Sequence, residues 1–430
     1  MLPASPNQSL TRNTSHNLVL PFYIYAAISF LAGTVFLFFS SSAMMQYYFH
    51  PQTLAITHIM ALGWGTMMIF GASHQLVPVL IERKIFSEQL GYIAFVLAGV
   101  GIPLLVYGFY YFHFGWQAKW GAILINVSIL VYLVNMAVSM AKSKKENVHA
   151  VYVFTGTLWL FLTTLLGLLL VYNFTQNILS MDSLHYLPLH AHLGIAGWFL
   201  LLIMGVGSRL IPMFFISKYD NTKTLWWIYG LINIALIIFL VEFLSSYHPI
   251  LNFLPVIMVL VAILLFGRFC FKCYKDRLRR KVDEPLQMSM LSTLLMAVPM
   301  VFLIVIILWN AFYAENSSLI LTYGFCIFFG WITAVIFGMT FKTLPFILWN
   351  KKYQKKMGTG KTPNPKELFS TKVFKGMTGF YISGFVLFIT GILFANIYII
   401  QFAAFLLIVT AFLYNMNVFK MIFHKPENRE

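Results

Sequence analysis

Two histidines, His190 and His192, lie near one end of an apolar stretch that runs from Leu189 to Pro212. A histidine within hydrocarbon is costly and marks a functional site by default, because the imidazole needs a polar partner or a metal there. Residues two apart on an α-helix point about 200° away from each other. The two imidazoles therefore cannot serve one small site from a straight helix, and we expect one site on each side of it.

The pattern around His192 occurs three times in the chain. A histidine, two glycines, a tryptophan and a proline recur at fixed spacing in two copies: His58, Gly63, Trp64, Gly71 and Pro78, and then, 134 residues later, His192, Gly197, Trp198, Gly205 and Pro212. A third copy follows at an offset of 133, with Phe325 where the histidine would stand, and then Gly330, Trp331, Gly338 and Pro345. The chain thus holds three copies of one helix, and two of them keep the histidine.

Two interpretations of these histidines are open. His58, His190 and His192 lie one to two turns below the outer ends of their helices, so they can share one depth in the membrane. Facing imidazoles at one depth suit an axially ligated haem. Alternatively, each imidazole is buried and hydrogen bonded to a backbone carbonyl. The repeated glycines likewise either leave room for something flat or let neighbouring helices approach closely.

Four further polar residues lie within apolar spans. His74 is 16 residues from His58, which is about 24 Å along a helix, so it cannot share that cofactor; it serves either a proton path or an interfacial hydrogen bond. Glu242 is a candidate ligand of a second metal or a proton carrier, or else a carboxylate at the headgroup level. Arg209 and Lys342 are expected to extend their charged ends to the interface.

The composition predicts an all-α integral membrane protein. Hydrophobic residues make up 60% of the 430 and charged residues 10%, and many apolar runs reach twenty residues. We expect twelve transmembrane helices: Leu20 to Tyr48, Thr53 to Leu80, Gln89 to Tyr111, Trp116 to Met140, Val151 to Tyr172, Tyr186 to Phe215, Thr224 to Ser246, Leu251 to Phe271, Leu286 to Phe312, Ser317 to Leu348, Lys375 to Asn396, and Ile397 to Phe419.

The net charge of +16 is an orientation signal on this topology. Of the 29 lysines and arginines, all except Lys119 lie on the side that holds both termini. The positive-inside rule then predicts cytoplasmic termini in a multi-pass protein of the cell inner membrane. The basic segments Arg268 to Lys281 and Lys351 to Lys375 are expected to contact anionic lipid headgroups rather than nucleic acid.

The repeat predicts the architecture. Between cytoplasmic tails at residues 1–19 and 421–430, a single membrane domain covers residues 20–420. We expect it to consist of three four-helix repeats, at about 20–145, 146–282 and 283–420, each with the Gly-Trp helix second. Such repeats are expected to lie around a pseudo-threefold axis.

The helix that carries His190-Ala191-His192 and, further on, Gly197-Trp198, Gly205 and Pro212 resembles the His-x-His helix of haem-copper oxidase subunit I. The resemblance is closest to C-type cytochrome oxidases and nitric oxide reductases, and it covers essentially the whole chain. It implies that His190 ligates a high-spin haem and that His58 and His192 form a low-spin pair. It also implies haem of the b type, with copper or non-haem iron as a second metal.

This sequence departs from the family pattern in two ways. The His-x-His helix is the sixth span here and the tenth in the family, and the seventh span offers Glu242 instead of a histidine pair. We therefore expect a haem between the second and sixth helices, held by His58 with His192 or His190, in a divergent oxidoreductase.

Such a protein would bind or reduce O2 or NO, or would transfer electrons from a cytochrome or quinol. The alternative is a non-catalytic protein on the same scaffold that handles metals or senses gas.

Overall fold

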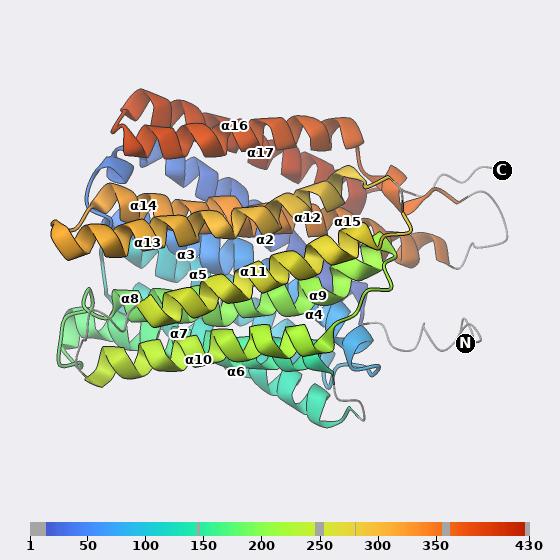
Figure 1. Ribbon diagram of the computed structural model, residues 1–430, viewed down its shortest axis with the longest axis horizontal. Coiled ribbons are helices and arrows are strands. Elements are labelled where there is room, and N and C mark those ends of the chain that lie inside the picture. The colour runs from blue at the N-terminus through green and yellow to red at the C-terminus, as the bar shows by residue number, and fades with distance from the viewer. Residues whose placement is uncertain (1–13, 144–146, 246–252, 280, 355–361, 426–430) are drawn as a thin grey trace. The chain divides into compact units, whose positions relative to one another are not determined.

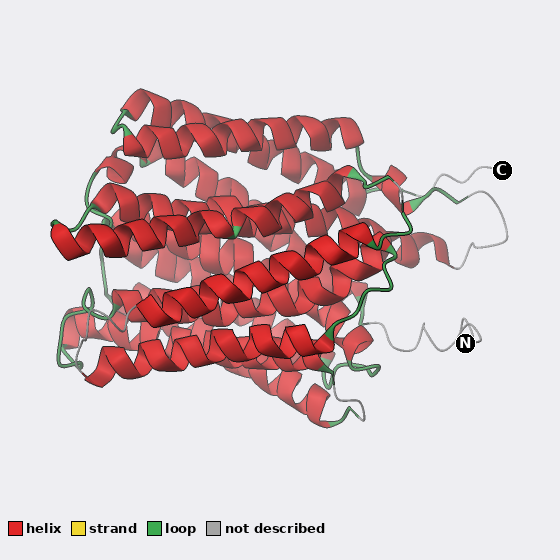
Figure 2. Cartoon of the chain, viewed as in Figure 1, coloured by secondary structure: helices red, strands yellow, loops and turns green. Residues whose placement is uncertain are grey.

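The computed structural model describes residues 14–143, 147–245, 253–279, 281–354 and 362–425. Within these residues the chain is helical and contains no β-strand (Figure 2). An isolated antiparallel β-bridge joins Ser217 and Arg277. Twelve of the described helices are long and apolar enough to span a membrane, which confirms the predicted multi-pass class: His16–Phe39, Pro51–Leu80, Glu88–Tyr110, Trp116–Ala141, Val148–Gln176, Leu187–Phe215, Thr222–Ser245, Phe253–Lys275, Glu284–Phe312, Ser317–Tyr353, Thr371–Leu393 and Ile397–Ile422.

Two compact units make up the chain. The first unit comprises Ser73–Lys281 together with the chain up to Leu18, and the second unit comprises Val19–Ala72 together with the chain from Val282 onward. The division into three repeats, the threefold axis and the cytoplasmic termini stay predictions. Most of the two predicted tails, at residues 1–13 and 426–430, lies outside the described residues.

The first unit contains the His-x-His segment. Asn126 on α6 (Trp116–Ala141) donates a hydrogen bond to the backbone oxygen of Thr164 on α7 (Val148–Gln176) at 2.9 Å and so ties these helices together. Helices α10 (Thr222–Ser245) and α11 (Phe253–Lys275) run side by side (Figure 1). The elements of this unit are the end of α4 (Met67–Leu80), α5 (Glu88–Tyr110), α6 (Trp116–Ala141), α7 (Val148–Gln176), α8 (Leu187–His192), η3 (Leu193–Leu200), α9 (Leu201–Phe215), α10 (Thr222–Ser245) and α11 (Phe253–Lys275).

The second unit is built around a buried aromatic core. The rings of Phe30 and Trp64 stack with centroids 4.7 Å apart, and Tyr414 meets Trp64 edge-on at 5.2 Å. The elements of this unit are α2 (His16–Phe39) from Val19, η1 (Ser41–Met45), α3 (Pro51–His58), η2 (Ile59–Thr66), the start of α4, α12 (Glu284–Leu295), α13 (Ala297–Phe312), α14 (Ser317–Phe325), η4 (Cys326–Ile332), α15 (Thr333–Tyr353), η6 (Pro365–Leu368), α16 (Thr371–Leu393) and α17 (Ile397–Ile422).

The ends of some predicted spans differ from the structure. The first span was expected to reach Tyr48, but α2 ends at Phe39. The serines that follow form the short 3-10 helix η1, in which the Ser41 hydroxyl donates to the backbone oxygens of Leu37 and Phe38. The predicted ends at Ser246 and Leu251 lie outside the described residues.

Candidate functional site

A π-helical segment follows each repeated histidine position. The segments η2, η3 and η4 begin at Ile59, Leu193 and Cys326, directly after His58, His192 and Phe325. Their starts are therefore separated by the same 134 and 133 residues as the sequence repeat. Because π-helical turns are rare and often lie at functional sites, their coincidence with the repeat identifies these three positions as equivalent.

His58 and His192 make the same local contact. In each, Nδ1 lies 2.7 Å from the backbone oxygen four residues earlier, that of Leu54 or of Pro188. Since a carbonyl only accepts, Nδ1 carries the proton and the lone pair of the neutral ring lies on Nε2. Both side chains are half-buried. The bond to a backbone carbonyl foreseen in the alternative interpretation is thus present, and it also presents Nε2 as the metal-binding atom.

His190 and His192 contact different helices. The Nδ1 atom of His190 lies 3.0 Å from the backbone oxygen of Thr163 on α7, and a methyl group at Gly167 would come within 2.8 Å of its Cε1. The ring of His192 instead lies 5.4 Å from that of Phe239 on α10. The prediction that the two imidazoles serve different sides of their helix is therefore confirmed.

Phe325 fills the equivalent position of the third copy with aromatic packing. Its ring stacks on those of Phe388 at 4.2 Å, Phe329 at 5.0 Å and Phe385 at 5.7 Å, all at interplanar angles of 14–15°. Phe325 is buried. The space beside this copy is occupied by side chains of the second unit, so this copy offers neither a ligand nor room for one.

The repeated glycines are sites of close helix packing. A methyl group at Gly197 would lie 2.6 Å from Cβ of Trp159, and one at Gly63 would lie 2.7 Å from the Ser29 hydroxyl. In most cases the neighbour belongs to the preceding long helix, as with Gly71 and Phe22, Gly205 and Tyr152, and Gly338 and Ser289. Gly330 instead meets Phe385 on α16. The expectation that these glycines leave room for something flat is wrong, because side chains of the adjacent helix fill that room.

His74 is fully buried in the first unit. Its ring meets that of Tyr132 edge-on at 5.5 Å, and the Tyr132 hydroxyl lies 2.6 Å from that of Ser73. The residue thus belongs to a buried polar group between α4 and α6. Its role in a proton path or in an interfacial hydrogen bond stays a prediction.

Glu242 lies on α10 one turn beyond Phe239, the residue that contacts His192. Its Oε2 atom is buried and has no hydrogen-bond partner within the described part of the chain. Among the described residues no three or more His, Cys, Asp or Glu side chains gather closely enough to hold a metal ion. The role of Glu242 as a ligand of a second metal or as a proton carrier stays a prediction.

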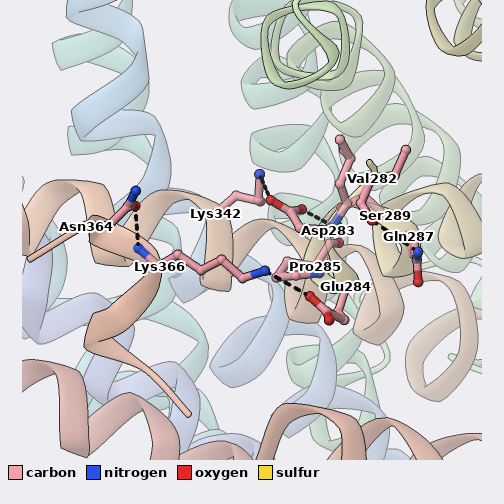
Figure 3. A network of polar contacts seen from close by, with 10 residues as sticks. Val282, Asp283, Glu284, Pro285, Gln287, Ser289, Lys342, Asn364 and Lys366 are labelled. Carbon is pink, nitrogen blue, oxygen red and sulfur yellow. Dashed lines mark hydrogen bonds and ion pairs between the residues drawn. The ribbon is translucent and has the colours of Figure 1, made fainter. Parts of the chain in front are cut away.

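Lys342 differs from the snorkelling lysine expected from the sequence. Its Nζ forms an ion pair with Oδ2 of Asp283 at 2.7 Å, and Figure 3 shows the two side chains pointing toward each other. Glu284, the next residue, pairs with Lys366 at 3.3 Å and with Lys375 at 3.4 Å. These pairs join the start of α12 to α15, η6 and α16 within the second unit.

The donor set fits axial ligation of haem in its chemistry. His58 and His192 each offer an imidazole whose Nδ1 proton is engaged by a carbonyl, which is the usual arrangement for a metal-binding histidine. Sequence reasoning foresaw both histidines and, as one alternative, a bond to a backbone carbonyl. It did not identify Leu54 and Pro188 as the partners, nor the contacts of His190 with Thr163 and Gly167. The i−4 spacing of Leu54 and Pro188 on a helix was the available signal.

Comparison with known proteins supports the fold. No family model matches the sequence, and no curated protein matches it. Among solved structures, the chain is similar to one from a cryo-EM structure of a heme-copper terminal oxidase dimer, with a TM-score of 0.67 and 11% sequence identity over 97% of this chain and 86% of that chain. At this identity the likeness concerns the fold, and it confirms the fold implied by the resemblance.

Proposed function

We propose that this chain is a haem-binding membrane protein with the fold of a haem-copper oxidase, in which His58 and His192 would be ligands of b-type haem. The observation that carries the proposal is the identical Nδ1 contact of the two residues at equivalent positions before a π-helical segment. In the third copy a phenylalanine stack stands in place of the histidine.

The carbonyl oxygens of Leu54 and Pro188 determine how the two imidazoles behave. By accepting the Nδ1 proton, each oxygen fixes the ring orientation and makes Nε2 a better donor. A haem held by these residues would supply the iron for electron transfer, and a haem with an open iron position would bind a diatomic gas. The protein chain itself would contribute two imidazole ligands of fixed orientation and an apolar environment for the haem.

His190 and Glu242 are the residues proposed for any second function of the site. By the motif, His190 would ligate a further haem, and the carbonyl of Thr163 would orient it. Glu242 would carry protons or bind copper or non-haem iron, and His74 would take part in a proton path. Reduction of O2 or NO, with a cytochrome or quinol as electron donor, would depend on these residues, and so would gas binding, because an iron held by two histidines has no open position. Electron transfer would not depend on them.

An absorption spectrum of the purified protein tests the proposal. We expect a Soret band that is lost in His58→Ala and in His192→Ala, measured oxidised and dithionite-reduced. The matched control is His149→Ala, since this histidine bonds to Gly205 and Ser208 and lies outside the repeated positions. A band shift with carbon monoxide would indicate an open iron position, and its absence would indicate bis-histidine electron transfer.

A colourless preparation after expression with added haem would refute haem binding. If metal analysis of that preparation found copper or zinc, the metal-handling or gas-sensing alternative would replace the proposal. A Soret band that survives in both alanine variants would retain haem but reject His58 and His192 as its ligands.

A further inference from the structure

A pocket of about 590 Å³ lies at one end of the first unit, where the loop between α9 and α10 meets the C-terminal end of α11. None of the histidines considered above takes part in it, so the proposed haem site does not account for it. It is lined by Lys218, Tyr219, Asp220, Lys272, Lys275 and Asp276.

The walls of this pocket are held in place by specific bonds. Asp276 Oδ2 accepts hydrogen bonds from the Ser217 hydroxyl and from the backbone N–H of Lys218, both at 3.0 Å. The backbone of Ser217 also bridges to that of Arg277. These bonds anchor the loop on the end of α11, so the pocket is part of the fold.

The pocket carries an excess of positive charge. Its lining comprises three lysines and two aspartates. Within the described residues, Lys218, Lys272 and Lys275 form no ion pair with an acidic side chain, and Asp276 is already engaged by the loop. The surplus of one charge matches a phosphodiester, which carries a single negative charge, and ammonium groups are common phosphate ligands.

Aromatic residues place the pocket at the level of lipid headgroups. Trp226 and Trp227, near the start of α10, are 46% and 71% exposed, and Phe271 and Tyr274, near the end of α11, are exposed as well. Exposed tryptophan and tyrosine are typical of the membrane–water interface. A ligand in this pocket therefore meets the lysines at the depth where phospholipid phosphates lie.

We propose that this pocket binds the phosphate group of an anionic phospholipid. Lys218, Lys272 and Lys275 attract the phosphate, and Tyr219 forms the wall beside them, with Lys272 Nζ 5.4 Å from the centroid of its ring. Asp220 lowers the affinity and favours lipids without a second negative charge. The inference is independent of haem and would stand if the proposed function failed.

Native mass spectrometry of the full-length protein, released from nanodiscs of equal phosphatidylglycerol and phosphatidylcholine, tests this inference. We expect the wild type to retain phosphatidylglycerol in preference to phosphatidylcholine. Replacing the three lysines by glutamine should weaken this retention about a hundred-fold, at about five-fold for each lysine. Lys223→Gln is the matched control, because this lysine lies in the first turn of α10 and does not line the pocket.

Asp220→Asn provides a test of opposite sign that remains available if the triple variant fails to fold. It should strengthen the retention of phosphatidylglycerol about five-fold; unchanged or weaker retention would overturn the proposal. Wild-type retention in a folded triple variant would overturn it too. Binding of inorganic phosphate to the wild type, together with no preferential retention of phosphatidylglycerol, would assign the pocket to a soluble phosphate-bearing ligand and reject the lipid.

Discussion

Removing one partner of the ion pair between Asp283 and Lys342 is expected to destabilise the second unit strongly. The two side chains are only 9% and 10% exposed, and their charged atoms lie 2.7 Å apart. Breaking a buried pair by removing one partner costs about 3–5 kcal/mol, because the remaining charge loses its nearest opposite charge. By contrast, an exposed pair contributes at most about 1 kcal/mol.

Asp283→Asn isolates the charge from the other role of this residue. Asp283 also caps α12, since its Oδ1 accepts a hydrogen bond from the backbone N–H of Leu286 at 3.2 Å. Asparagine caps a helix as well as aspartate does, so the cap is kept while the ion pair is lost. We expect Asp283→Asn to lower the free energy of unfolding by about 3–5 kcal/mol.

A double-mutant cycle in detergent measures the pair itself. Combining Asp283→Asn with Lys342→Met should recover much of the loss, which corresponds to a coupling of up to about 3 kcal/mol. The matched control is the cycle of Glu284→Gln with Lys366→Met, a pair whose side chains are 25% and 47% exposed. Equal coupling in the two cycles would refute the reasoning that burial, and not mere proximity, makes the pair strong.

Two further predictions concern packing and titration. Gly197→Ala should destabilise the protein by about 1–3 kcal/mol in a thermal or denaturant unfolding assay, because its methyl group would meet Cβ of Trp159 at 2.6 Å. Gly324→Ala, with no atom within 4 Å of the added carbon, should be neutral or stabilising, and a loss there equal to that at Gly197 would contradict this explanation. Burial, with a further contribution from Glu315, raises the pKa of Tyr48, which lies outside the membrane-spanning helices. Since the folded protein keeps this proton more tightly than the unfolded chain, the free energy of unfolding should fall as the pH rises above about 10. In the Tyr48→Phe variant, the free energy of unfolding measured across the same pH range should fall less steeply.

The transmembrane spans could be predicted from the sequence because each is a long apolar run. Their ends could not be predicted equally well. Hydropathy continues past Phe39, yet α2 ends there because the Ser41 hydroxyl bonds back to the carbonyls of Leu37 and Phe38. Likewise, Lys342 was expected to extend to the interface, because hydropathy does not report that Asp283, 59 residues earlier in the chain, pairs with it.

The candidate site was predictable in its residues but not in its surroundings. The repeat identifies His58 and His192 as equivalent without any structure. The π-helical turns that follow them leave no mark on the apolar pattern, because nearly all side chains there are apolar. The contacts of His190 with Thr163 and Gly167 depend on how α7 packs against α8, which local sequence does not specify.

The third copy separates the role of the π-helical turn from that of the histidine. The segment η4 begins after Phe325 just as η2 begins after His58, so the widened turn forms without an imidazole. A threonine lies at the end of two of these segments and donates its hydroxyl hydrogen to the backbone oxygen five residues earlier. Thr66, the last residue of η2, does so at 2.9 Å, and Thr333, the residue after η4, at 2.7 Å. The turn is therefore a property of the Gly-Trp helix, to which the histidine adds a donor. For this reason, loss of a haem band in His192→Ala would indicate loss of a ligand rather than loss of the helix.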